Sequence, residues 1–416
     1  MKKMRRLSKV AVAVLLMTLL ASIPGLAGCG GGAVKTTNTI KYGWCWDFTG
    51  RAAYGVTHTF QAVKDYLEWT QETNPVEGVN IEMITWDTHS DASRITPGYF
   101  WLKGQGAQIM SASPPDMEVL RRQLEKDEMP FYIQPISQSI IDSPLIVGFY
   151  GTTDAQIEAT LHWIMENWDV TAKGKCRIGV VTLAGVSFYM SQVAITEKIV
   201  LQDHANVFQY VGAQMAPTTT TAWAGEIAKL KDSDYIVVAL SGPSLSSFLK
   251  EARQRGYGGK FVGPMESWLS FWPLVKASVS EDDLNGIICA TYMQWWTEPC
   301  HVINEASAFY AQKYTPAEIA EMHLSTSGFN GWIVGMILVD ALRRAAESAG
   351  PENVTGKILF EALKETRMIE DGWDQPWEIT EGVNCLMRGV KLMQYNKDIQ
   401  DWKSITSYVI PPSLGG

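Results

Sequence analysis

The chain has 416 residues, a formal net charge of −9 at pH 7 and 46% hydrophobic residues. It is longer than one hydrophobic core usually supports, which indicates two domains. The acidic balance argues against a surface for the phosphates of nucleic acid, so no nucleic-acid partner is expected.

The first 28 residues have the order of an export signal. Basic residues at 2–6 precede an almost wholly apolar run at 10–27 (VAVAVLLMTLLASIPGLA), with small residues before Cys29. This order favours an export signal over a single membrane-spanning helix. The stretch Leu26-Ala27-Gly28-Cys29 resembles the lipobox of bacterial lipoproteins, in which the signal is cut before the cysteine and the thiol carries lipid. The resemblance implies a signal peptide over 1–28 and an extracytoplasmic protein that lipid on Cys29 anchors to the bacterial cell membrane.

After the lipobox, residues 29–37 contain three successive glycines and predict a flexible tether. From there on, strand-like and helical patterns alternate. The first series comprises strand 39–46, helix 56–74, strand 79–88, strand 107–113, helix 115–128 and strand 129–137, and helix 154–168 follows it. The second comprises strand 176–185, helix 187–202, strand 205–217, helix 218–233, strand 234–242, helix 243–257 and strand 260–268. Helices 327–348 and 355–366 and short strands at 376–380, 389–397 and 402–410 complete the chain.

The alternation of strands and helices predicts an α/β protein with parallel sheets. Strands 176–185 and 234–242 are nearly continuous apolar runs, as is typical of buried parallel strands. Right-handed crossovers place the loops after parallel strands at one edge of each sheet, where ligands bind.

Five segments carry a family resemblance through their order and spacing. They are the turn TGRAAYG at 49–55, the loop, helix and strand at 109–137, the strand and loop at 176–194, the strand–helix–strand run at 234–264 and the helix at 328–350. Together they resemble type I periplasmic binding proteins, specifically the branched-chain amino acid and amide group of ABC importers (Leu/Ile/Val-binding-protein-like).

The resemblance implies two Rossmann-like lobes with parallel sheets, joined by three crossovers near residues 150, 293–297 and 375. Lobe 1 would comprise 38–150 and 297–375, and lobe 2 would comprise 151–296 and 376–416. The lobes would close on a small organic solute by a hinge motion and deliver it to the permease subunits of an ABC importer. Most family members work as monomers, so the resemblance implies a monomer.

The resemblance also implies where a ligand carboxylate would bind. Hydroxyls and backbone N–H groups at the start of a helix suit an anion. The alternative is that the serines there only cap the helix that begins near residue 115. The matching residues are Ser111, Ala112, Ser113, Ser137 and Gln138.

In amino-acid binders of the family, an acid of the second lobe binds the ammonium group, and the matching position here falls at Met265 or Glu266, of which Glu266 is the candidate. The alternative is that Glu266 is solvated. Ser241 follows another strand of the same lobe.

The chain has 16 tryptophans, and many aromatic residues fall at loops that the topology sends to one edge. A single tryptophan more often belongs to the core, but so many at these loops can form a ligand wall, which fits a flat or cationic ligand better than leucine. The candidates are Trp46, Tyr54, Phe188, Tyr189, Trp268, Tyr292 and Trp295. The ligand remains open among a branched-chain or polar amino acid, an amide, a urea-like compound, an aromatic acid and a quaternary amine.

Catalysis is not expected. The Gly-x-Ser at 185–187 lacks the closing glycine of a nucleophile elbow, and the histidines show no metal spacing. No metal or cofactor is therefore expected, and the rival function is a ligand-sensing module for a signalling partner. Five cysteines follow Cys29, an odd number that leaves at least one thiol free unless it pairs between chains.

Overall fold

The computed structural model describes residues 37–134, 138–298 and 300–416. The expected signal peptide, the lipidation site Cys29, the tether up to residue 36 and the site residue Ser137 therefore lie outside the described residues. Among the described residues, no helix is both long and apolar enough to cross a membrane.

The first sheet belongs to lobe 1 and is parallel throughout. Its strand order is β13-β5-β4-β3-β1-β2. The strands are β1 (Asn38–Trp46), β2 (Val79–Asp87), β3 (Ile109–Ala112), β4 (Phe131–Ile133), β5 (Ile146–Tyr150) and β13 (Cys385–Met387).

The second sheet belongs to lobe 2 and has the order β15-β14-β10-β9-β8-β6-β7. Its five strands from β10 to β7 are parallel, and β14 and β15 add an antiparallel edge. The strands are β6 (Cys176–Leu183), β7 (Phe208–Ala216), β8 (Tyr235–Ala239), β9 (Lys260–Pro264), β10 (Ile288–Thr291), β14 (Lys391–Asn396) and β15 (Asp401–Ser404). All five residues of β8 are buried, because helices cover both faces of the sheet.

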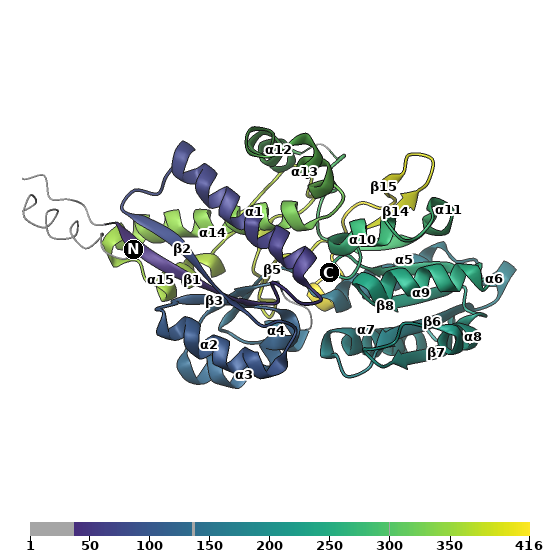
Figure 1. Cartoon of the computed structure of the whole chain (residues 1–416). Coiled ribbons are helices and arrows are strands. Elements are labelled where there is room, and N and C mark those ends of the chain that lie inside the picture. Colours follow the sequence, from purple (N-terminus) through teal and green to yellow (C-terminus); the bar gives the residue numbers. More distant parts are fainter. Residues whose placement is uncertain (1–36, 135–137, 299) are drawn as a thin grey trace, which may run out of the picture. The chain divides into compact units, whose positions relative to one another are not determined.

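Helices cover both faces of the first sheet. In Figure 1, α1 (Ala53–Thr73) and α14 (Ser327–Ala349) lie side by side, with α2 (Ile95–Gly104) and α3 (Pro114–Asp127) across the strands from them. The close approach of α14 to α1 requires glycine, because a Cβ atom on Gly331 would lie 2.1 Å from the carbonyl oxygen of Thr59. The other helices of lobe 1 are α4 (Gln138–Ile141), α12 (His301–Lys313), α13 (Pro316–Met322) and α15 (Gly356–Lys364).

In lobe 2, α5 packs against α7, whereas α9 packs against α8, α10 and α11. Right-handed crossovers place these two groups on opposite faces of the sheet. The bounds are α5 (Thr153–Asn167), α6 (Val170–Lys173), α7 (Ser187–Glu197), α8 (Ala224–Leu230), α9 (Gly242–Gln254), α10 (Trp272–Lys276) and α11 (Glu281–Leu284). A separate two-stranded ribbon joins β11 (Arg367–Met368) to β12 (Trp377–Glu378).

The chain passes between the two sheets three times. The first passage follows β5 and the second follows β10. The third lies at 388–390, between β13 of the first sheet and β14 of the second, and not near residue 375 as expected. The expected boundary was wrong because β13 has only three residues, too few to show a strand pattern. The five cysteines of the described residues are all free and buried.

Candidate functional site

At the end of β1, the predicted site residues of lobe 1 are tied to one another. The indole N–H of Trp46 donates to the hydroxyl of Ser111 at 2.9 Å, and both residues are buried. Parallel pairing of β1 with β3 sets Ser111 opposite Trp44 and Ala112 opposite Cys45. Ser111 and Ala112 are thus buried in the core of lobe 1 and do not lie on the surface at the end of β3.

Ser113, the next residue, lies at the start of α3 with extended backbone. Its hydroxyl does not cap the helix but bonds to the carboxylate of Asp116, which is only 8% exposed. Burial raises the pKa of Asp116 to about 6; the bond from Ser113 lowers it, and the buried carboxyl of Asp47 raises it further. Because this pKa lies below 7, Asp116 places a carboxylate beside Ser113 at neutral pH, which neither the ligand-binding nor the helix-capping interpretation of the serines predicted.

The turn after β1 is built around Asp47, which the sequence analysis did not single out. Its carboxylate accepts the backbone N–H groups of Gly50 at 2.6 Å and Ala52 at 3.0 Å, and the hydroxyl of Ser90. The signal was its place directly after β1, two residues before the TGRAAYG stretch begins. Tyr54 belongs to that stretch and is the second residue of α1.

Tyr54 is half-buried, and its ring lies 4.6 Å from that of His58. Burial raises its pKa, and the carboxylate of Glu321 in α13 raises it further. Tyr54 is thus placed beside α13. Gln138 is the first residue of α4, and its side chain lies outside what the structure describes.

In lobe 2, three predicted residues lie close together. The hydroxyls of Tyr189 and Ser241 are 2.5 Å apart and share a hydrogen bond, and the rings of Phe188 and Tyr189 lie 4.8 Å apart. Burial raises the pKa of Tyr189, while the guanidinium of Arg51 in lobe 1 opposes that rise. The starts of α7 and α9 therefore form one group that is within electrostatic range of lobe 1.

Phe188 is one of the side chains that connect the two lobes. It packs against the main hydrophobic cluster and also against a second cluster formed only by lobe 1 residues of β1, β3, β4, β5 and α2–α4. α7 and α3 are in contact at this point. The strand-end loops of the two lobes therefore meet here.

A second contact joins the loop after β9 to the start of α14. The backbone N–H of Thr326 donates to the carbonyl of Leu269 at 3.3 Å, and the hydroxyl of Ser327 donates to the carbonyl of Ser270 at 3.4 Å. Sequence reasoning missed this contact, since a run of serines and threonines has no periodic signal.

Glu266 is 6% exposed and therefore not solvated. The amide of Gln156, in α5, donates to both of its carboxyl oxygens at 2.8 Å. Burial raises its pKa to about 8, against which its own backbone N–H and Gln156 act. Burial therefore favours the protonated form of this carboxyl, and its enclosure beside Gln156 keeps it from a ligand ammonium group.

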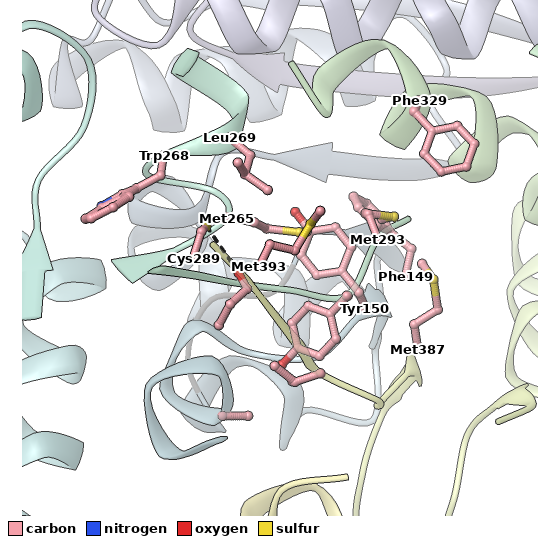
Figure 2. Close-up of a cluster of buried hydrophobic side chains, with 14 of the residues drawn as sticks. Phe149, Tyr150, Met265, Trp268, Leu269, Cys289, Met293, Phe329, Met387 and Met393 are labelled. Carbon is pink, nitrogen blue, oxygen red and sulfur yellow. Dashed lines mark hydrogen bonds between the residues drawn. The ribbon is translucent and has the colours of Figure 1, made fainter. Parts of the chain in front are cut away.

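Trp268 belongs to the core. Its side chain is fully buried, its indole N–H donates to the carbonyl of Val238 at 3.1 Å, and a Cβ atom on Gly263 would lie 2.3 Å from that nitrogen. Figure 2 shows Trp268 beside Leu269, at one side of an apolar cluster that includes Tyr150 and Met387 of lobe 1 and Met293 of the second passage.

Tyr292 and Trp295 lie in the second passage. The hydroxyl of Tyr292 donates to the carbonyl of Thr152 at 2.7 Å, so it ties the second passage to the first. The indole N–H of Trp295 donates to the carboxylate of Asp401 at 2.7 Å. Both side chains are buried, and their hydrogen bonds hold the segments that pass between the sheets.

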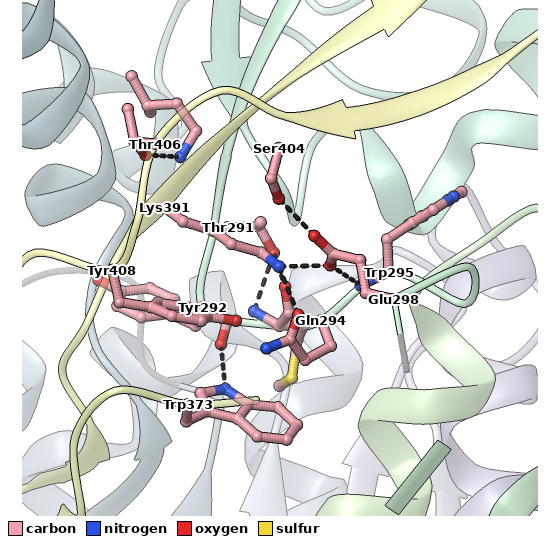
Figure 3. A network of polar contacts seen from close by, with 12 residues as sticks. Thr291, Tyr292, Gln294, Trp295, Glu298, Trp373, Lys391, Ser404, Thr406 and Tyr408 are labelled. Atoms are coloured by element: carbon pink, nitrogen blue, oxygen red, sulfur yellow. Dashed lines mark hydrogen bonds and ion pairs between the residues drawn. The ribbon is translucent and has the colours of Figure 1, made fainter. Parts of the chain in front are cut away.

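An ion pair between buried Lys391 and partly exposed Glu298 adds to these contacts (Figure 3). The ammonium of Lys391, at the start of β14, bonds to the carboxylate of Glu298 and to the amide oxygen of Gln294, the latter at 2.6 Å. Burial lowers the pKa of Lys391, and the nearby Glu298 opposes this. The network links the second passage to the third.

Among the residues that the structure describes, no group of three or more His, Cys, Asp or Glu side chains is placed to hold a metal ion. The polar groups at the strand ends are hydroxyls, carboxylates and backbone amides. Such an arrangement can orient a small molecule by hydrogen bonds.

Comparisons with known proteins match this architecture. The family model described as "Periplasmic binding protein" matches residues 39–400. No curated protein sequence matches the chain. A branched-chain amino acid ABC transporter protein from Thermus thermophilus with bound valine superposes with a TM-score of 0.78 at 16% identity, over 91% of this chain and 98% of that one.

Two further solved structures share the fold. A fatty acid ABC transporter substrate-binding protein from Thermomonospora curvata gives a TM-score of 0.77 at 19% identity, covering 91% of this chain and 94% of that one. A solute-binding protein from R. palustris in complex with 4-hydroxybenzoate gives 0.71 at 16% identity, covering 91% and 99%. The two-lobed α/β architecture is that of type I periplasmic binding proteins, and the chain belongs to the periplasmic binding protein family.

Proposed function

We propose that this protein captures a small organic solute between the strand-end loops of its two lobes and delivers it to the permease of an ABC importer. The observation that carries the proposal is the meeting of these loops at Phe188, a lobe 2 residue that packs against the hydrophobic cluster formed only by lobe 1 residues. Hydroxyl and carboxyl groups of Ser113, Asp116, Tyr189 and Ser241 lie at the same strand ends. A solute there would be held by a few polar groups beside aromatic rings.

The charges at the site favour a solute that presents hydrogen-bond donors to lobe 1. Ser113 is bonded to Asp116, and Asp47 lies close enough to raise the pKa of Asp116. A ligand carboxylate at that position would be repelled at pH 7, when Asp116 is ionised. Because Glu266 is only 6% exposed and both of its carboxyl oxygens accept from Gln156, it is not available as a partner for the ammonium of an α-amino acid. Amides and amines with an apolar part that packs on Phe188 therefore fit best.

The structural relatives do not decide the solute. Their recorded ligands or transported compounds include valine, a fatty acid and 4-hydroxybenzoate, which share little beyond a carboxylate. The fold thus accommodates different solutes through its loops. The solute has to be inferred from the side chains of this chain.

A thermal-shift screen of residues 37–416 tests the binding proposal. The panel contains valine, 4-hydroxybenzoate, a medium-chain fatty acid, short amides, urea, primary amines and quaternary amines. A ligand at 100 times its Kd stabilises the native state by about 2.7 kcal/mol, which raises the unfolding midpoint measurably. We expect hits among the amides and amines at pH 7. A hit confined to carboxylates contradicts the solute class, and no hit from a folded protein contradicts solute binding.

We further propose that Cys29 carries a lipid that holds the protein on the outer side of the cell membrane. The support is the lipobox-like LAGC stretch after an apolar run. Metabolic labelling with a clickable fatty acid should mark the wild-type protein and fail to mark Cys29→Ser. Labelling of the variant to the same extent would contradict the anchor.

Delivery to a permease is tested by partner capture. Crosslinking of the exported protein in its own cells should recover the membrane subunits of an ABC importer. Recovery of a signalling kinase without a permease would instead support a ligand-sensing role.

A further inference from the structure

A small cavity lies at the third passage between the sheets, away from the strand-end site. It has about 10 Å³ in which the centre of a water molecule fits. Its lining comes from three segments: residues 373–377 before and within β12, residues 387–389 at the third passage, and Tyr408 near the end of the chain. Figure 3 shows Trp373 and Tyr408 beside the Lys391 network.

Four of the lining residues carry a buried polar atom with no hydrogen-bond partner among the described residues. These atoms are Oε1 of Gln375, Nε1 of Trp377, Nε of Arg388 and the hydroxyl oxygen of Tyr408. Trp377 is 1% exposed and Tyr408 is 8% exposed. A buried polar group without a partner costs about 1–3 kcal/mol, so four such groups on residues that line one cavity favour an occupant that can bond to them.

We propose that one ordered water molecule occupies this cavity and hydrogen-bonds to these side chains. The available volume corresponds to about one water molecule, and buried waters usually bond to otherwise unsatisfied polar groups. Trp377 and Arg388 supply N–H donors, Gln375 supplies an acceptor, and the hydroxyl of Tyr408 can do either. A species that donates and accepts satisfies this mixture, whereas an anion would leave the acceptor of Gln375 unpaired.

The water would join parts of the chain that belong to different sheets. Trp377 lies on the β11–β12 ribbon, Arg388 follows β13 of the first sheet, and Tyr408 follows β15 of the second. Nearby, Lys391 lies 5.1 Å from the ring centre of Tyr408, next to its ion pair with Glu298. The water thus belongs to the hydrogen-bond network around the third passage. Its position does not depend on which solute the protein binds.

A crystal structure of residues 37–416 at high resolution tests the proposal directly. We expect one ordered water within hydrogen-bond distance of at least two of the four atoms. A cavity without density, or one in which soaked bromide gives an anomalous peak, would overturn it.

A double-mutant cycle gives a second test in solution. Trp377→Phe and Tyr408→Phe each remove one group that bonds to the water. If Trp377 and Tyr408 bond to the same water, the double variant changes the equilibrium constant of unfolding by about threefold or more less than the product of the changes in the two single variants. The control pairs Tyr408→Phe with Trp402→Phe, because Nε1 of Trp402 is also buried and unpartnered but does not line the cavity. Equal additivity in both cycles would contradict the shared water.

Discussion

The buried carboxyl of Glu266 should make the protein less stable as the pH rises. Its pKa is raised from 4.5 to about 8 by burial in lobe 2, with Gln156 as its hydrogen-bond partner. The unfolded chain releases this proton near pH 4.5, whereas the folded chain keeps it until about pH 8. Unfolding is therefore favoured progressively over that window, and below it Glu266 has no effect on the pH dependence.

The magnitude follows from the pKa difference. Each tenfold change in proton affinity corresponds to about 1.4 kcal/mol, so the full window amounts to roughly 5 kcal/mol. Glu266→Gln keeps an acceptor for Gln156 but cannot ionise. We expect the variant to gain stability relative to wild type by several kcal/mol between pH 5 and pH 8.

Urea unfolding of residues 37–416 at pH 5, 6, 7 and 8 and constant ionic strength measures this difference. Groups common to both proteins, including Asp116, cancel when the variant is compared with wild type. Glu82→Gln on β2 is the control, because that side chain is exposed. A wild-type-to-variant difference that is the same at pH 5 and pH 8 would refute the reasoning.

Three further changes test other parts of the structure. Gly263→Ala should destabilise the fold by about 3 kcal/mol in urea unfolding, because the added Cβ would lie 2.3 Å from the indole nitrogen of Trp268. That nitrogen cannot move away without losing its hydrogen bond to Val238. A variant as stable as wild type would contradict this packing. Lys391→Met should cost about 2 kcal/mol in the same assay, since it removes the cation of Glu298, which keeps its bonds from Trp295 and Ser404. A neutral result would show that the pair contributes nothing. Asp116→Asn should raise the affinity for carboxylate solutes at pH 7 but change it little at pH 5, because the pKa of Asp116 is about 6. Calorimetric titration at both pH values measures the two affinities. An equal change at both pH values would contradict the charge assigned to Asp116.

The sequence predicted the elements with clear patterns. Strand β8 and helix α14 follow from an apolar run and from helical spacing, and the two-lobed α/β class follows from their alternation. The third passage was placed wrongly because β13 is a three-residue strand whose pairing with β5 is set by the fold and not by local pattern. Elements with mixed composition, such as α2, were not predicted either.

The site was predicted less well, because position in a loop does not fix the direction of a side chain. Glu266 was placed correctly at a strand end, but its partner Gln156 lies 110 positions away in the sequence. Trp268 was read as a ligand wall, yet the turn after β9 folds its ring back onto Gly263. Asp116 was noted only as a first-turn residue, since nothing local shows that Ser113 bonds to it.

The most direct test of the central claim is calorimetric titration of the solute found in the thermal-shift screen against wild type, Phe188→Ala and Trp268→Phe. Phe188 packs on both lobes at the proposed site, whereas Trp268 is buried in the core of lobe 2. Solute binding at the strand-end loops predicts that Phe188→Ala weakens the affinity at least tenfold and that Trp268→Phe, if folded, changes it less than threefold. Unchanged affinity in Phe188→Ala would place the solute elsewhere and contradict the account.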